Sequence, residues 1–193
     1  VTGIDNLTAE QVEAHAVNSD VETSGEFRTS NDLINKINKI WQRSQLDNMH
    51  GAIASDCPHR ERSPYTGDGQ VACVTVMHNF DAQTFYNKWL RDIRGAQTPG
   101  GYVPNGAPWQ PGCGGGVGWG AAMEIMPWEF YQHYGDRRVL EQNFNAMRRH
   151  VRWMTTWVDD KTGLMLSHDE QRWKNLGDWL PPRELPRAEL VHT

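Results

Sequence analysis

The sequence predicts an all-α fold of the α/α toroid type, in which helices alternate between an inner and an outer ring and loops at one end build the site. Two observations lead to this prediction. Apolar residues recur at intervals of three and four over most of the chain after residue 30, which is the spacing of one helix face. Long segments rich in glycine and proline separate these stretches, whereas an ordinary helical bundle uses short connections.

The composition places the chain among folded globular domains. Hydrophobic residues make up 38% of its 193 residues and charged residues 22%, both near the averages of such domains, and this length predicts one domain. The net charge of −5 is spread without a basic cluster, which argues against a nucleic acid or a membrane surface as partner. No apolar run approaches the roughly 20 residues that a membrane-spanning helix needs.

The cysteines and tryptophans of the chain indicate which kinds of site and ligand to expect. Cys57, Cys73 and Cys113 are widely spaced and form no C-x-x-C pair, so we expect free thiols, without a disulfide framework or a zinc site. The nine tryptophans outnumber the five phenylalanines. An indole has a flat apolar face and one donor on its edge, which suits the C–H faces and hydroxyl rims of sugars. We therefore expect a carbohydrate partner, and neither a metal nor an organic cofactor.

The chain is expected to open with an extended segment. Residues 1–29 alternate loosely between apolar and polar residues, which is typical of one or two strands. They are interpreted as an extended lead-in or the end of a preceding β domain, and residues 30–193 as the helical domain. The first expected helix covers residues 30–48, with Ser30 as its capping residue. Its apolar face carries Leu33, Ile34, Ile37, Ile40 and Trp41.

Three further helices are expected around one long loop. The second helix covers residues 69–94 and closes at Gly95. The segment 95–118 holds much of the glycine and proline of the chain and is expected to be a functional loop. Helices resume at 119–134 and 137–158. The stripe of the last helix consists of Val139, Leu140, Phe144, Met147, Val151, Met154 and Val158.

The stretch SDCPHRERSPYTGDGQ, residues 55–70, concentrates charge just before the second expected helix. Hydrolysis of a glycosidic bond needs one carboxylic acid that protonates the leaving oxygen and a second carboxylate. The acid has to stay protonated near neutral pH, which requires partial burial or a nearby like charge. Glu61 lies in sequence between Asp56 and Asp68 and between two prolines, so partial burial and a nearby like charge are both available to raise its pKa. This makes Glu61 the candidate general acid.

The remaining charges of this stretch allow more than one pairing. Arg60 and Arg62 would lower the pKa of a carboxyl group that they faced, so we expect them to hold Asp56, Asp68 or sugar hydroxyls. Asp68 has a second interpretation, as the cap of a helix that begins at Gly69. The sequence does not decide among these pairings.

Three separated motifs resemble the α-L-rhamnosidases of glycoside hydrolase family 78. The stretch at 55–70, preceded by QLDNMHGAIA, is similar to the family signature of D-C-P-x-R, an E-R pair, an aromatic residue and T-G-D. The segment GWGAAMEIMPWEFYQHYGD resembles the family's G-W-G-x-A followed by P-W and a Y-G-D turn. LGDWLPP resembles its G-D-W loop. The three motifs occur in the family's order and cover roughly residues 28–182.

This resemblance implies an (α/α)6 barrel of the six-hairpin glycosidase type that works with inversion, with Glu61 as the general acid. About twelve helices need roughly twice this length, so the chain is interpreted as the N-terminal half of the barrel, and the family's general base, a later Glu, lies beyond the matched motifs. The resemblance also implies an L-rhamnose-containing substrate and an extracytoplasmic location. The sugar-binding residues that it implies are Asp56, Arg60, Tyr65, Asp68, Trp119, Asp178 and Trp179.

The chain departs from the family pattern at several positions. One residue fewer separates Asp56 from Glu61 than in many members, and Tyr65 stands where many members have Trp. Ala121 replaces a common Asp, and Pro64 replaces a common Gly. These departures concern the details of substrate recognition rather than the reaction class.

Two other functions stay open. A polysaccharide lyase on the same helical scaffold would cleave a rhamnose–uronate linkage and release an unsaturated product. A rhamnose-binding or structural remnant without turnover would follow if 193 residues were the whole protein, because half a ring lacks the base. The run GVGWGA at 116–121 matches a dinucleotide-binding fingerprint, but no expected strand precedes it, which argues against that site.

Overall fold

The computed structural model describes residues 2–3, 6–110, 114 and 116–165, and these residues are mostly helical. The all-α class expected from the sequence is therefore confirmed. Among the described residues, no helix combines the length and the hydropathy that crossing a membrane requires. The helices are α1 (Asp32–Asp47), α2 (Thr66–Asn79), α3 (Gln83–Ala96), α4 (Val117–Gly120), α5 (Ala122–Tyr134) and α6 (Arg138–Thr155).

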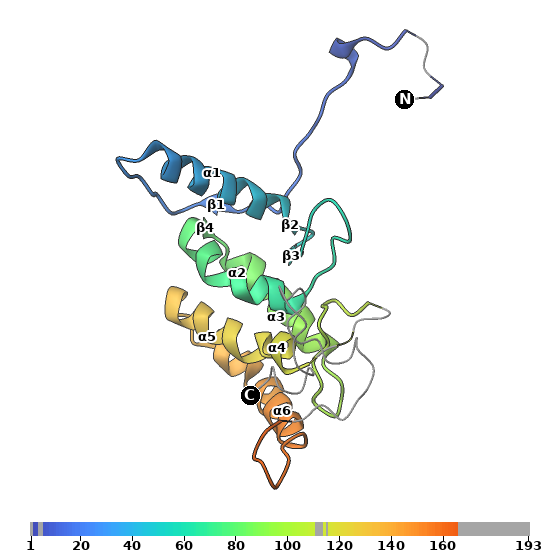
Figure 1. The fold of residues 1–193 in the computed structure, drawn as a ribbon, viewed down its shortest axis with the longest axis vertical. Helices are drawn as coiled ribbons and strands as arrows, with labels where there is room; N and C mark the ends of the chain where they lie inside the picture. Colours follow the sequence, from blue (N-terminus) through green and yellow to red (C-terminus); the bar gives the residue numbers. More distant parts are fainter. Residues whose placement is uncertain (1, 4–5, 111–113, 115, 166–193) are drawn as a thin grey trace.

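The helices α1, α2, α5 and α6 follow one another along the long axis of the molecule (Figure 1). The helix α5 lies at the centre of the helical packing, because it contacts α2, α3 and α6. The single turn α4 packs on α2 and leads into α5. The largest fully buried side chains come mainly from these central helices: Trp89, Tyr86, Phe80, Phe130, Met49, Met77, Leu90, Ile93, Met123 and Met126.

The sequence placed one long helix at residues 69–94, and the structure divides it into α2 and α3. The chain becomes extended at the strand β4 (Phe80–Asp81), which pairs with the strand β1 (Glu22–Thr23) of the lead-in. The apolar spacing did not reveal this break, because Phe80 is as buried as the helical residues around it. The helix α2 also begins earlier than expected, at Thr66, with Tyr65 as its N-cap.

The lead-in is mostly exposed and extended, as the sequence predicted. It contains a short 3-10 turn (Ala9–Gln11) and β1, and it is bound both to the hairpin formed by β2 (Met49–His50) and β3 (Ile53–Ala54) and to the last residue of α2. At the hairpin the Ser19 N–H donates to Met49 O over 2.6 Å. At the end of α2 the Gly25 N–H donates to Asn79 O over 3.1 Å.

The loop after α3 is held against α2 on one side and α6 on the other. The Thr66 N–H donates to Asn105 O (2.8 Å) and the Ala107 N–H donates to Pro64 O (3.0 Å). On the α6 side, the Gln97 amide donates to Ala146 O (2.9 Å). These bonds bring the glycine-rich loop and the stretch at 55–65 to the same side of the molecule, where α2 begins (Figure 1).

Several apolar side chains expected inside the fold are exposed. The helix α1 forms as predicted, although Asn31 rather than Ser30 caps it. Its apolar stripe is not covered by the described residues, since Leu33 is 65% exposed and Ile40 is 66% exposed. Trp128 on α5 is 50% exposed. These faces are available for contact with further protein.

Candidate active site

A cavity of about 500 Å³ opens where α2 begins. Its wall comes from the end of α1, from β3 and the residues after it, from the first two turns of α2, and from α4. Three of the residues predicted from the sequence, Asp56, Asp68 and Trp119, line this cavity. The structure therefore brings together side chains that are up to 63 positions apart in the chain.

Trp119 reaches the cavity because the first turn of α2 leaves room for its indole. A Cβ atom added to Gly67 would lie 2.9 Å from Cδ1 of the indole, so only glycine fits there without displacing the ring. The Thr66 hydroxyl donates to Trp119 O over 2.9 Å and holds the backbone of α4 at the same place. The first two residues of the family-like T-G-D segment, Thr66 and Gly67, thus position α4 and the indole of Trp119.

Asp68 is the third residue of α2, so the alternative in which it caps a helix beginning at Gly69 is wrong. Partial removal from water raises the pKa of Asp68, and the negative charges of Asp56 and Glu61 add to this effect. Backbone hydrogen bonding and a hydrogen bond from the Trp119 indole oppose it. The residue stays accessible through the cavity. Asp68 is therefore a carboxyl group whose surroundings favour the protonated form.

Asp56 lines the cavity with a carboxylate that is mostly buried. The Cys57 thiol donates to Oδ2 over 3.0 Å, and the Asp56 side chain is only 11% exposed. Its other oxygen, Oδ1, is buried and has no hydrogen-bond partner in the described part of the chain. A buried acceptor without a partner costs free energy.

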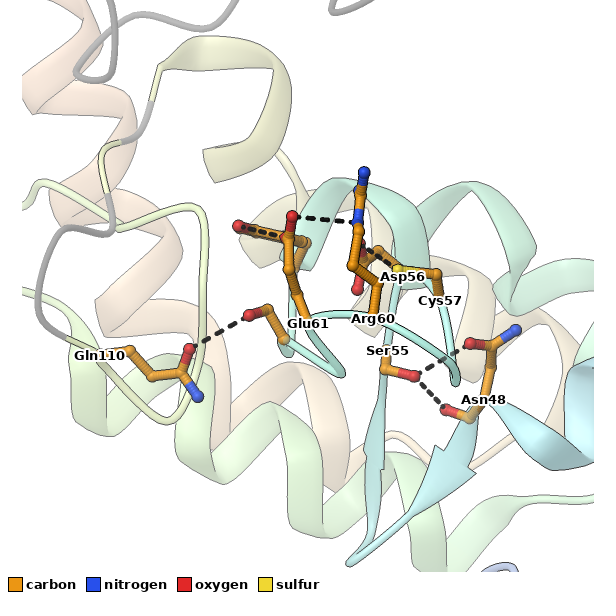
Figure 2. A network of polar contacts seen from close by, with 9 residues as sticks. Asn48, Ser55, Asp56, Cys57, Arg60, Glu61 and Gln110 are labelled. Atoms are coloured by element: carbon orange, nitrogen blue, oxygen red, sulfur yellow. Dashed lines mark hydrogen bonds and ion pairs between the residues drawn. The ribbon is translucent and has the colours of Figure 1, made fainter.

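Glu61 does not line the cavity as the structure describes it. It accepts a hydrogen bond from the Tyr65 hydroxyl over 3.0 Å and pairs with Nε of Arg60 over 3.2 Å (Figure 2). Its side chain is 41% exposed. The partial burial expected of a general acid is therefore not found, and the group that pairs with Glu61 is a cation.

Arg60 lies between the two carboxylates. Its Nη2 is 3.7 Å from Asp56 Oδ2, while its Nε is bound to Glu61. Negative charge on Glu61 is the main cause that raises the pKa of Arg60. The other arginine of the stretch binds the backbone instead of a carboxylate: Arg62 Nε donates to Pro58 O over 2.7 Å. The pairing of Arg60 with Asp56 is one that the sequence left open. Its pairing with Glu61 was not expected, and the expectation that both arginines would avoid the proposed acid is therefore wrong for Arg60.

The cavity also contains polar residues that the sequence analysis missed. Gln45, at the end of α1, lines it together with Asn48 and Ser55. The Ser55 hydroxyl donates to Asn48 Oδ1 over 2.9 Å, beside Asp56 (Figure 2). These residues lie just before or within the quoted stretch, but polar residues in a short turn carry no signal of their own. No cluster of metal-ligating side chains occurs in the described ranges.

Asp178 and Trp179, the last two predicted sugar-binding residues, lie outside the described residues. So does Cys113. The other two cysteines are free thiols: Cys57 is partly exposed, and Cys73 is buried, which raises its pKa to about 12.

Comparison with known proteins places this arrangement in a family. The family described as bacterial alpha-L-rhamnosidase 6 hairpin glycosidase domain matches residues 22–192. An alpha-L-rhamnosidase of Formosa agariphila is 31% identical over 91% of this chain, which spans 19% of that protein. One of Streptomyces avermitilis is 33% identical over 87% of this chain and 16% of its own length.

Solved structures agree with the sequence relatives. The alpha-L-rhamnosidase from Dictyoglumus thermophilum superposes with a TM-score of 0.82 and 33% identity, covering 99% of this chain and 21% of that one. The Streptomyces avermitilis enzyme, solved in complex with L-rhamnose, gives a TM-score of 0.79 and 29% identity over 91% of this chain and 16% of its own. The chain spans about a fifth of its relatives' length. It belongs to the bacterial α-L-rhamnosidase six-hairpin glycosidase domain family.

Proposed function

We propose that the protein containing this chain is an inverting exo-glycoside hydrolase that releases terminal α-L-rhamnose from a glycoside or polysaccharide. The observation that carries this proposal is the cavity lined by two acidic residues, Asp56 and Asp68, together with the indole of Trp119. Carboxylates accept hydrogen bonds from sugar hydroxyls, and an indole packs on the C–H face of a sugar ring. The names of the relatives support rhamnose as that sugar.

In this proposal Glu61 protonates the leaving oxygen while water attacks the anomeric carbon from the opposite face. Glu61 is held at the end of its loop by Tyr65, and the Arg60 side chain that pairs with it is 63% exposed and free to turn. We propose that Arg60 leaves Glu61 when substrate enters and turns toward Asp56 or a sugar hydroxyl. This movement frees the Glu61 carboxyl oxygen that Arg60 holds, so that it can face the glycosidic oxygen. We assign no general base among the described residues.

The experiment follows the product of the first turnover. The whole protein is incubated with a terminal α-L-rhamnoside, and proton NMR records which anomer of free rhamnose appears before mutarotation. An inverting enzyme gives the β anomer first, and this is the result we expect. A retaining enzyme would give the α anomer, which would overturn the assignment of inversion.

The same reaction separates the two alternatives that the sequence left open. A lyase acting on a rhamnose–uronate linkage would release an unsaturated product that absorbs in the near ultraviolet, in place of a hydrolysed one. A rhamnose-binding remnant would bind the sugar in calorimetry without forming any product. Either result would contradict the proposed hydrolase.

A further inference from the structure

We infer that His150 is a positioning residue for Trp119, and that Glu124 fixes His150 in this role. Neither residue touches the cavity. The inference rests on the proposed function, because it concerns the indole that lines the same cavity. It follows from the contacts at the two ends of the imidazole ring.

The first end of the ring is fixed by α5. Nδ1 of His150 lies 3.0 Å from each of the two carboxylate oxygens of Glu124. The His150 side chain is 0% exposed, and its ring stacks on Trp153 with centroids 5.5 Å apart and planes 13° from parallel. A buried ring with both its plane and one nitrogen fixed has a single orientation.

The other end of the ring meets the backbone of α4. A Cβ atom added to Gly120 would lie 2.6 Å from Nε2 of His150, so the ring is in contact with the residue that follows Trp119. Nε2 is buried and has no hydrogen-bond partner within the described ranges. A buried N–H there would lose its hydrogen bond to water, so we assign the tautomer in which Nδ1 carries the proton and donates it to Glu124.

The turn α4 depends on such contacts for its position. It has four residues, and a helix of one turn is unstable without tertiary packing. On the cavity side, the Thr66 hydroxyl binds Trp119 O (2.9 Å), and the indole rests on Gly67. On the far side, His150 supports Gly120. The turn α4 therefore lies between the start of α2, which Trp119 contacts, and the imidazole, which Gly120 contacts, and removal of the ring takes away one of these contacts.

The consequence for function is specific. Replacement of His150 with Ala opens a gap beneath Gly120, and α4 can then move away from α2 and carry the indole off Gly67. We expect KM for an α-L-rhamnoside to rise on the order of tenfold, because misplacement of a binding group by about 1 Å has effects of this order or larger. We expect kcat to change by less than about threefold, because the proposed acid, Glu61, is on a different loop.

A matched control separates positioning from general loss of stability. Asn143 is on the same helix, α6, and is 1% exposed. It accepts a hydrogen bond from Arg94 over 2.7 Å and donates to Val139 O over 2.7 Å, so it is also a buried, bonded polar residue. In the whole protein, His150→Ala and Asn143→Ala should both lower Tm, but only His150→Ala should raise KM. An equal KM in the two variants would overturn the inference.

A second measurement reads the indole without turnover. Tryptophan is replaced by 5-fluorotryptophan, and the fluorine resonance of Trp119 is identified by its loss in Trp119→Phe. We expect this resonance to move in His150→Ala and in Gly120→Ala, where the new methyl group meets Nε2, and to stay in Asn143→Ala. The double variant His150→Ala with Gly120→Ala should return it toward the parent position, because the missing ring makes room for the methyl group.

The two readouts distinguish failure of the inference from failure of the proposed function. An unmoved Trp119 resonance in His150→Ala contradicts the positioning role, whatever sugar the protein cleaves. A parent protein that releases no rhamnose, combined with a shifted resonance in His150→Ala, contradicts the proposed function and leaves the positioning of Trp119 supported.

Discussion

Three carboxyl groups act on one another at the proposed site, and they differ in what surrounds them. Asp56 keeps a buried oxygen without a partner, Glu61 faces the cation of Arg60, and Asp68 is partly removed from water near both. Partial burial and the nearby negative charges raise the pKa of Asp68, whereas Glu61 is paired with a cation. The three carboxyl groups therefore have different surroundings before any substrate enters.

The raised pKa of Asp68 predicts a pH dependence of stability. Because the pKa is raised above 3.8 by folding, the unfolded chain releases this proton first as pH rises. The free energy of unfolding then decreases from about pH 3.8 up to the folded-state pKa, and the loss is complete above it. Asp68→Asn lacks this loss, so its stability relative to the parent should increase over the same range. Urea unfolding at a series of pH values measures this.

A carboxylate with the opposite shift serves as the control. The hydrogen bond from Arg138 lowers the pKa of Asp136, so Asp136 stabilises the fold above its ordinary pKa and loses this effect as pH falls. Asp136→Asn should therefore lose stability relative to the parent as pH rises. If the two variants followed the same trend, the environment described for Asp68 would be contradicted.

At the scale of single residues, the sequence indicated which side chains gather but not how they pair. Asp56, Asp68 and Trp119 lie around one cavity, and their roles as sugar ligands stay predictions. The pairing of Arg60 with Glu61 was not predictable, because it depends on how a six-residue loop folds back on itself. Gln45 was missed although it begins the quoted segment QLDNMHGAIA, because the family-like motif residues all follow it in the chain.

At the scale of elements, glycines set how closely α2 and α3 approach. A Cβ atom on Gly69 would lie 2.0 Å from Cη2 of Trp89. Trp89 is fully buried, and its indole N–H donates to Ala107 O over 2.7 Å. The ring cannot move without breaking that bond or displacing the core, so the small size of residue 69 determines this packing.

This contact predicts that adding one methyl group at residue 69 lowers the stability of the fold. Gly69→Ala should lower the free energy of unfolding by about 1–3 kcal/mol or more, as overpacking of a core does. Gly95→Ala is the matched control, because Gly95 lies in α3 and a Cβ atom there would meet nothing within 4 Å. That variant should gain about 0.5–1 kcal/mol from reduced chain entropy. Denaturant unfolding of both would show the difference, and similar values would argue against the described packing.

The helices themselves were predictable, and their interruptions were not. Intervals of three and four located α1 and α6 closely, because the periodicity of a helix face is a local property of the sequence. The break between α2 and α3 was missed because Phe80 continues the apolar pattern while its backbone pairs with β1. Pairing with a strand about 60 residues earlier in the chain is a long-range event that local periodicity does not record.

The exposed stripe of α1 predicts a contact made in the whole protein. Ile37 is 56% exposed, and the chain spans about a fifth of its relatives' length, so we expect other parts of the protein to cover this face. Ile37→Asp in the whole protein should then lower Tm by several degrees, because it buries an unpaired charge. Lys36→Asp, on the adjacent exposed position, should change it little. Equal effects would mean that the face stays in water.

At the scale of the whole molecule, function depends on which carboxyl group delivers a proton. The proposed glycosidase site rests on the family assignment and on the cavity beside the loop at 55–65, and the proposal gives the proton to Glu61. Asp68 is the alternative donor within the same site, since its pKa is the raised one. A single comparison of variants distinguishes them.

The most direct test measures kcat/KM of the whole protein on two α-L-rhamnosides, one with an acidic aryl leaving group and one with an alkyl leaving group. An acidic leaving group departs without protonation, so Glu61→Gln should keep most of its activity on the aryl substrate and lose about 10²–10⁴-fold on the alkyl one. Asp68→Asn should lose similar factors on both. If Glu61→Gln lost equally on both substrates while Asp68→Asn showed the selective loss, the proposed role of Glu61 would be contradicted.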